Sequence, residues 1–220
     1  NPVWNLLHTI SILFIGFFLV DCWAINAYTI PPRYNGDKKG YYPNYDMYHN
    51  YEDYIKELKE ISEQYSQYIT LEYSNSTTRH DTPLILTKLR YPGQPSLSNG
   101  KPNGKKIKML YTFGEHAREL IGVESFFHLL KNLTQGLESD VDSIAYHYST
   151  FVLSHIDIDL VGVMNPDGKK HMETVDNYCW RNNAENVDLN RNADWNYGGI
   201  GSSTDKNSED WLYNNPEFQT

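Results

Sequence analysis

Cysteine is scarce in this sequence, which contains only Cys22 and Cys179. Two cysteines form at most one disulfide, and this excludes the small scaffolds that several disulfides hold together. The fold must therefore depend on a hydrophobic core, and a hydrophobic content of 40% is sufficient to build one. Internal repeats and low-complexity tracts are also missing, so 220 residues are expected to form one large domain or two small ones.

Positively charged residues are also few. The chain has 19 Lys and Arg residues against 28 Asp and Glu residues, and its formal net charge is −9. The nearest approach to a basic run, from Lys101 to Lys108, lies in a turn that contains Pro and Gly. A general nucleic-acid-binding protein needs a basic surface, so nucleic acid is not expected as a partner.

Apolar runs long enough for a stable membrane span are absent. The run from Ile10 to Val20 has 11 residues, a length that fits the hydrophobic region of a secretory signal peptide. Cys22 and Ala24 are small residues that allow cleavage after Ala24, so residues 1–24 are predicted to be a signal peptide. A short N-terminal anchor and a core segment remain alternatives, because no Lys or Arg precedes the run.

Two glycosylation sequons, at Asn75 and Asn132, fit a secretory route, although sequons also occur by chance. The protein is therefore expected to be secreted or to enter the secretory pathway, with an extracellular or a vacuolar or lysosomal destination. Cleavage of the signal peptide would leave Cys179 as the only cysteine of this chain. It would be either free or paired with a cysteine beyond Thr220.

The rest of the chain alternates between strand-like and helical patterns. Residues 25–50 lack periodicity and are read as a linker or arm, and residues 51–68 have apolar side chains at helical spacing, with Asn50 as the N-cap. Residues 69–73 and 83–90 predict an antiparallel strand pair. The later pattern predicts a buried strand at 107–114, a helix at 119–136 ending near Gly136, a helix near 141–153 and a strand at 155–165. This order indicates an α/β sandwich with helices on both faces of a sheet.

The sequence after Met164 is polar and rich in Asn, Asp, Gly and Trp. A structureless segment of this length is uncommon in a compact domain unless it is functional. We therefore expect loops that carry a site.

His116 and Glu119 are the first candidates for that site. They lie three residues apart, directly after the predicted strand, and at this spacing two side chains can face one point. Imidazole nitrogen and carboxylate oxygen are both good Zn²⁺ ligands, but a catalytic zinc needs three protein ligands. On spacing alone, a surface pair that arose by chance is the simpler interpretation.

Four motifs that follow one another in the sequence favour a metal site over a chance pair. They are "GEHARE", "NPDG", "CWRNN" and "VDLNRN". Together they resemble the zinc metallocarboxypeptidases of the carboxypeptidase A type (peptidase M14). The resemblance covers Tyr51 to Thr220, the amino-terminal part of that family's catalytic domain. It implies a three-layer α/β/α sandwich around a mixed β-sheet, incomplete at the C-terminus, with Zn²⁺ as the cofactor.

The resemblance implies roles for individual residues. His116 and Glu119 correspond to the first two zinc ligands, and Arg118 to an arginine near the substrate carbonyl and the outer subsite. Arg181 corresponds to the catalytic arginine that polarises the scissile carbonyl, a role for which a fixed positive charge is suited.

Three further residues complete the set implied by the resemblance. Asn190 and Arg191 correspond to the pair that holds the terminal carboxylate of the substrate, which arginine can bind with two parallel hydrogen bonds. Asp188 corresponds to the carboxylate that orients the zinc-bound histidine. Without the motifs, Arg181 and Arg191 would be interpreted as surface arginines of an acidic protein.

The sequence also departs from the family pattern. The third zinc ligand, the general-base Glu and the substrate-side Tyr lie beyond Thr220 in that pattern, and Ala193 replaces the usual aromatic residue after "NRN". The chain is therefore expected to be part of a longer protein, to lack peptidase activity alone and to bind zinc weakly.

The expected function is hydrolysis of C-terminal peptide bonds, with peptide or protein C-termini as partners and a monomeric state. Two alternatives remain open. One is a zinc acylase or amidohydrolase of the same fold, and the other is a non-catalytic module that binds carboxylates. A serine hydrolase is not indicated, because no Gly-x-Ser-x-Gly motif is present.

Overall fold

The computed structural model describes residues 43–78, 80–93, 105–193 and 197–212. The expected signal peptide and residues 25–42 of the expected arm lie outside the described residues. No helix among the residues described is both long enough and apolar enough to cross a membrane.

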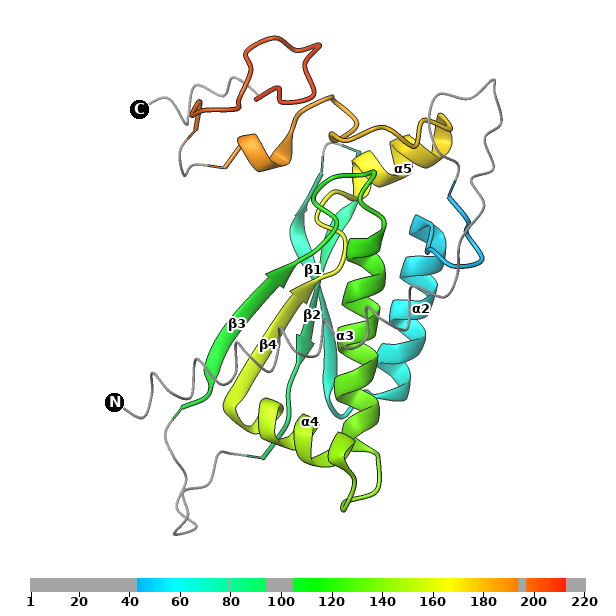
Figure 1. Ribbon diagram of the computed structural model, residues 1–220, viewed down its shortest axis with the longest axis vertical. Helices are drawn as coiled ribbons and strands as arrows, with labels where there is room; N and C mark the ends of the chain where they lie inside the picture. Colours follow the sequence, from blue (N-terminus) through cyan, green and yellow to red (C-terminus); the bar gives the residue numbers. More distant parts are fainter. Residues whose placement is uncertain (1–42, 79, 94–104, 194–196, 213–220) are drawn as a thin grey trace. The chain divides into compact units, whose positions relative to one another are not determined.

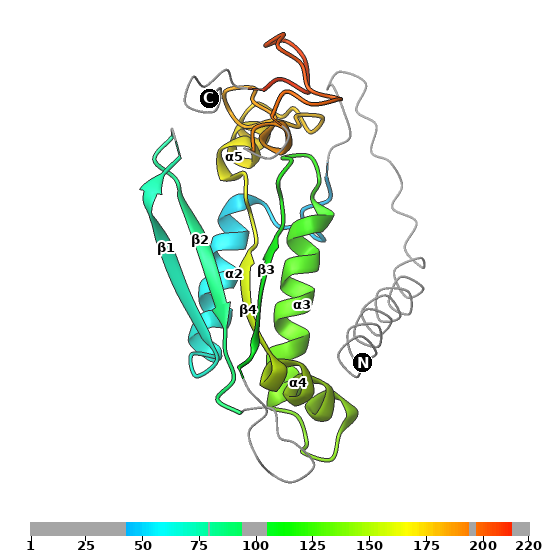
Figure 2. The ribbon, with the colours of Figure 1, turned by 90° about the vertical axis from the view of Figure 1, so that its left-hand side faces the viewer.

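Four strands form one mixed sheet in the order β1-β2-β4-β3 (Figures 1 and 2). β1 (Ile69–Thr77) and β2 (Pro83–Leu89) are antiparallel, as the sequence predicts. β4 (Ile156–Val161) is antiparallel to β2 and parallel to β3 (Ile107–Thr112). The parallel pair requires a crossover connection, which the chain supplies with two helices.

Those two helices are α3 (Ile121–Leu137) and α4 (Ile144–His155). The sequence predicts that Gly136 stops the first helix, and α3 ends one residue later. Gly136 has a packing role as well, because a Cβ there would lie 2.0 Å from Oγ of Ser149 on α4. The glycine therefore allows α4 to pack closely against α3.

α2 (Tyr51–Gln64) begins as predicted, with the Asn50 side chain accepting a 2.8 Å hydrogen bond from the Asp53 backbone N–H. The helix ends at Gln64, before the predicted Tyr68. The reason is that Tyr65 and the residues after it form backbone turn bonds that lead directly into β1.

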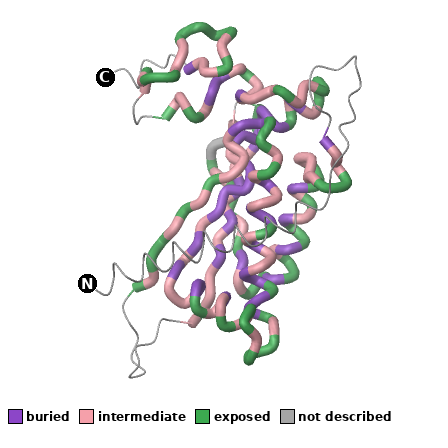
Figure 3. The backbone as a smooth tube through the Cα atoms, viewed as in Figure 1, coloured by how far each residue is buried: buried purple, intermediate pink, exposed green. Residues whose placement is uncertain are grey.

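The helices α2 and α3 lie on one face of the sheet, and the buried core fills the space between them (Figures 2 and 3). The opposite face of the sheet carries ion pairs from Lys88 to Glu72 and from Arg90 to Asp159, beside the exposed Leu110. The described residues thus form two of the three expected layers. The central core residues are Tyr54, Leu58, Leu89, Phe126, Leu130, Leu133, Leu153, Ile158 and Leu160.

The prediction of a buried strand at 107–114 is wrong in one respect. Among the described residues β3 has a single neighbour, β4, and forms an edge of the sheet. Ile107 is 49% exposed and Leu110 is 64% exposed. An apolar strand sequence does not distinguish a central position from an edge position, because neighbours along the sheet come from distant parts of the chain.

The polar segment after Met164 contains a helix that the sequence interpretation missed. α5 (Pro166–Thr174) starts at the "NPDG" motif, where the Asn165 side chain accepts a 2.9 Å hydrogen bond from the Gly168 backbone N–H. The signals were present: an Asn N-cap followed by Pro at the first helical position is typical of a helix start.

Candidate active site

The turn after β3 carries His116 to the carboxyl end of the sheet. Backbone hydrogen bonds continue past the strand, from Phe113 N to Val161 O at 2.9 Å and from Asn165 N to Gly114 O at 3.0 Å. Gly114 has a φ of +64°, in the left-handed region that glycine adopts without strain. Open α/β sheets bind ligands at this end of their parallel strands.

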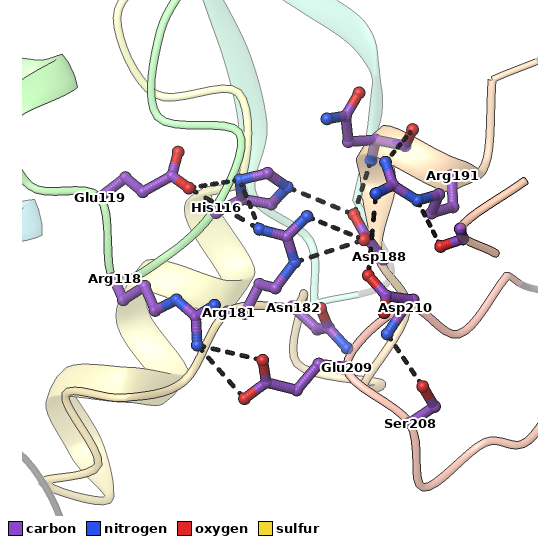
Figure 4. A network of polar contacts seen from close by, with 12 residues as sticks. His116, Arg118, Glu119, Arg181, Asn182, Asp188, Arg191, Ser208, Glu209 and Asp210 are labelled. Atoms are coloured by element: carbon purple, nitrogen blue, oxygen red, sulfur yellow. Dashed lines mark hydrogen bonds and ion pairs between the residues drawn. The ribbon is translucent and has the colours of Figure 1, made fainter. Parts of the chain in front are cut away.

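His116 and Glu119 face each other in the turn that precedes α3 (Figure 4). His116 Nδ1 lies 2.7 Å from Glu119 Oε1. The His116 side chain is buried, whereas 52% of the Glu119 side chain is exposed. The predicted pair therefore converges on one point at the border between the core and solvent.

Asp188 lies on the other side of the His116 ring and is fully buried. Its Oδ1 accepts a 2.9 Å hydrogen bond from the Asn190 backbone N–H and lies 3.3 Å from His116 Nε2. That 3.3 Å separation is an ion-pair distance, and Nε2 forms no well-directed hydrogen bond with any described residue. A carboxylate in this position favours the tautomer that carries its proton on Nε2 and leaves Nδ1 free as a ligand.

Arg181 binds both of these acidic groups. Its Nε and Nη2 donate hydrogen bonds to Asp188 Oδ2 at 3.3 and 3.0 Å, and its Nη1 lies 3.7 Å from Glu119 Oε1. The arginine is held by its backbone, because the Arg181 carbonyl accepts a 2.9 Å hydrogen bond from Ala117 N. We refer to His116, Glu119, Arg181 and Asp188 as the site cluster.

Within the site cluster, His116 Nδ1 faces both a hydrogen-bond donor and a hydrogen-bond acceptor. Arg181 Nη1 lies 3.1 Å from this atom and, as an arginine nitrogen, can only donate. Glu119 Oε1, at 2.7 Å, can only accept when the carboxylate is ionised. A cation bound between Nδ1 and Oε1 would satisfy both of these electron-rich atoms, so this donor pair fits Zn²⁺ chemically.

A complete metal site is not found in the part of the chain that the structure describes. No group of three or more His, Cys, Asp or Glu residues there could hold a metal ion. Among the described residues, His116 and Glu119 are thus a pair of candidate ligands and not a complete site.

Arg118 points away from the site cluster (Figure 4). Its Nη1 lies 3.2 Å from both carboxylate oxygens of Glu209 and donates at 3.2 Å to the Cys179 carbonyl. Cys179 itself is exposed and in no disulfide with a described residue. Sequence reasoning missed Glu209, and no local signal could have found it, because it lies 91 positions from Arg118.

Asn190 and Arg191 belong to a short 3-10 helix, η1 (Leu189–Arg191), that Asp188 caps. The Arg191 Nε donates a 2.8 Å hydrogen bond to the Gly201 carbonyl, and its Nη2 lies 3.8 Å from Asp210 Oδ1. The structure therefore places both residues next to the site cluster through Asp188. It shows no direct contact from the Arg191 guanidinium to His116 or Glu119.

The two glycosylation candidates differ in their surroundings. Asn75 is exposed on β1. Asn132 is half-buried in α3, and its side-chain nitrogen lies 2.8 Å from His128 Nε2. Asn75 is therefore the more accessible of the two side chains.

A sequence profile of the family described as zinc carboxypeptidase matches residues 54–219. The chain belongs to the zinc carboxypeptidase family. No curated protein sequence matches it. The α/β fold and the family that the four motifs predict are thus confirmed, and the helices and mixed sheet match the carboxypeptidase fold.

Solved structures give the same fold. The structure of thrombin-activatable fibrinolysis inhibitor has a TM-score of 0.62 and 24% identity, over 79% of this chain and 41% of that one. The bovine protein, solved with tick carboxypeptidase inhibitor, has a TM-score of 0.59 and 23% identity, over 79% and 52%. Carboxypeptidase A from Helicoverpa armigera has a TM-score of 0.55 and 23% identity, over 76% and 39%. The chain thus spans about half or less of the length of these structures.

Proposed function

We propose that this chain is the amino-terminal part of a zinc-dependent carboxypeptidase that hydrolyses C-terminal peptide bonds. The observation that carries the proposal is the site cluster. A histidine nitrogen and a carboxylate converge at 2.7 Å, a buried carboxylate lies behind the histidine, and an arginine lies beside both.

His116 and Glu119 would hold the metal in this protein. When bound, zinc in such a site activates water and polarises the substrate carbonyl. Asp188 would keep the His116 ring in the tautomer and orientation that leave Nδ1 available. Its complete burial makes this orientation rigid, because a buried carboxylate has to keep its few partners.

Arg181 would stabilise the negative charge that develops on the carbonyl oxygen of the scissile bond. Its side chain is already fixed by Asp188, so little reorganisation is needed when the substrate binds. Asn190 and Arg191 would bind the terminal carboxylate, which restricts cleavage to the end of a peptide. Arg118 would contact the substrate further from that end.

Several wider features belong to the same proposal. The third zinc ligand and the general-base Glu would come from chain outside the described residues. We further propose a secretory route with a signal peptide at 1–24 and a catalytic domain that begins at Tyr51. The substrates would be peptide or protein C-termini, and the enzyme would be monomeric.

The test is release of C-terminal amino acids from peptides by the longer protein that contains this chain. Activity should be lost with a zinc chelator and should return with added Zn²⁺. Arg181→Gln should lower kcat by about 10² to 10³, the usual effect of removing one donor to a developing oxyanion. Glu185→Gln, an exposed carboxylate paired with His80, is the matched control and should leave activity unchanged.

Two results would contradict the proposal. One is chelator-resistant peptidase activity, and the other is hydrolysis of acylated amino acids with none on peptides. The second result would favour a zinc acylase of the same fold.

A further inference from the structure

His49 lies between two carboxylates from different helices. Its Nε2 is 2.7 Å from Glu57 Oε2 on α2, and its Nδ1 is 2.9 Å from Glu124 Oε2 on α3. The His49 backbone N–H also donates a 2.8 Å hydrogen bond to Glu124 Oε1. One residue of the segment 43–50 therefore joins that segment to both helices.

The surroundings of His49 hold its ring in place. The ring packs against Phe127 with centroids 4.5 Å apart, and Lys131 pairs with the second oxygen of Glu57. A pocket of about 380 Å³ between the 43–50 segment and α2 opens beside the ring. Protons can therefore exchange with solvent without unfolding. The other charged groups that line this pocket are Asp46, Asp53, Lys56 and Glu60.

The geometry requires two protons on one ring. An ionised carboxylate can only accept a hydrogen bond, and a neutral imidazole has a single N–H to donate. With ionised carboxylates at both ring nitrogens, only the imidazolium satisfies both contacts. A neutral ring would place a nitrogen lone pair against one of the two carboxylates.

We propose that His49 acts as a proton-dependent latch, whose doubly protonated ring holds residues 43–50 against α2 and the first turn of α3. Loss of one proton removes one carboxylate contact and loosens the segment. Glu124 lies in the first turn of α3, which directly follows the turn that carries His116 and Glu119. The His49 latch therefore also braces the helix end next to the site cluster.

The pKa values define the pH range of the latch. The hydrogen bond to Glu124 raises the pKa of His49 above its ordinary value of 6.5, despite the opposing effect of burial. Burial alone would raise the pKa of Glu57, but Lys131 and His49 together lower it below 4.5. A raised histidine pKa gives stability that is complete below 6.5 and is lost as pH rises through the folded-state pKa. The latch should thus be closed at mildly acidic pH and open at alkaline pH.

The experiment follows His49 and its segment together in the native chain. An NMR titration of the imidazole should give a His49 pKa above the ordinary value. Amide hydrogen exchange at residues 48–50 should accelerate at least roughly tenfold as the ring loses its proton, the factor expected for one lost charge-assisted hydrogen bond. The exchange rates are compared after correction for the intrinsic effect of pH.

Glu57→Gln is the decisive variant, because a neutral His49 can donate to Glu124 and accept from the new amide. It should keep the segment bound while the His49 pKa falls and the pH response disappears. His147→Gln, at an exposed histidine of α4, should change neither property. Any of three results would overturn the proposal. They are a His49 pKa at or below 6.5, amide exchange at 48–50 that does not change as His49 titrates, and a pH dependence of that exchange that is unchanged in Glu57→Gln.

Discussion

At the scale of single residues, the buried carboxylate of Asp188 is the group on which the contacts of the candidate site converge. It receives hydrogen bonds from the Arg181 side chain and from the Asn190 backbone, and it faces the His116 ring. The "VDLNRN" motif predicts this residue, but it does not predict that one carboxylate also fixes Arg181. That contact depends on how two loops meet, which local sequence does not determine.

Asp188→Asn should therefore destabilise the chain by about 3 kcal/mol, because it leaves the Arg181 charge without its buried partner. Urea unfolding measures the change in free energy. The matched control is Asp210→Asn, an exposed carboxylate 3.8 Å from Arg191, which should change stability by less than about 0.5 kcal/mol. Equal effects of the two substitutions would show that the Asp188 contacts contribute little.

Thr87 is a second residue that the sequence does not mark. Its side chain is fully buried in β2, and its hydroxyl has no hydrogen-bond partner in the described part of the chain. Thr87→Val keeps the shape and removes the unpaired hydroxyl, so it should stabilise the chain by about 1 kcal/mol. The same substitution at Thr70, exposed on β1, is the control and should have a smaller effect. A destabilised Thr87→Val variant would mean that the hydroxyl has a partner.

At the scale of elements, the helices and strands follow their sequence patterns where the pattern is local. The Asn50 cap, the antiparallel β1–β2 pair and the α3 helix are all found close to their predicted positions. The edge position of β3 among the described strands could not be predicted, because strand order depends on contacts between distant segments. The α5 helix was missed for a different reason: its polar composition concealed a usable N-cap signal.

Substitution of Gly136 tests the close packing of α3 against α4. Helix propensity alone predicts that Gly136→Ala stabilises α3 by about 1 kcal/mol. We expect the opposite sign, a loss of about 1 to 3 kcal/mol, because the new Cβ would lie 2.0 Å from Ser149 Oγ. Thermal or urea unfolding distinguishes the two signs, and adding Ser149→Gly should restore part of the loss. Gln135→Ala, at the exposed neighbouring position, should be nearly neutral.

At the scale of the whole molecule, the family could be predicted from four short motifs, and the zinc carboxypeptidase match over residues 54–219 confirms it. The motifs identify the family because the residues they contain, from the turn after β3 and from residues 181–191, lie together at one end of the sheet. The partners of Arg118 and Arg191 could not be predicted in the same way. Glu209 and Asp210 contact these arginines from a loop. An isolated parallel β-bridge pairs Ser203 with Trp211 in this loop.

His116 and Glu119 are proposed to form a metal-binding pair, and zinc titration of the chain, followed by NMR of its histidine rings, tests this pairing. His49 and His80 also contact glutamates, so they serve as internal controls. We predict that Zn²⁺ perturbs the His116 ring first, with weak affinity, and that Glu119→Gln removes the response. A first response at His49 or His80, or a His116 signal unchanged by Zn²⁺, would contradict the proposed pairing of His116 with Glu119.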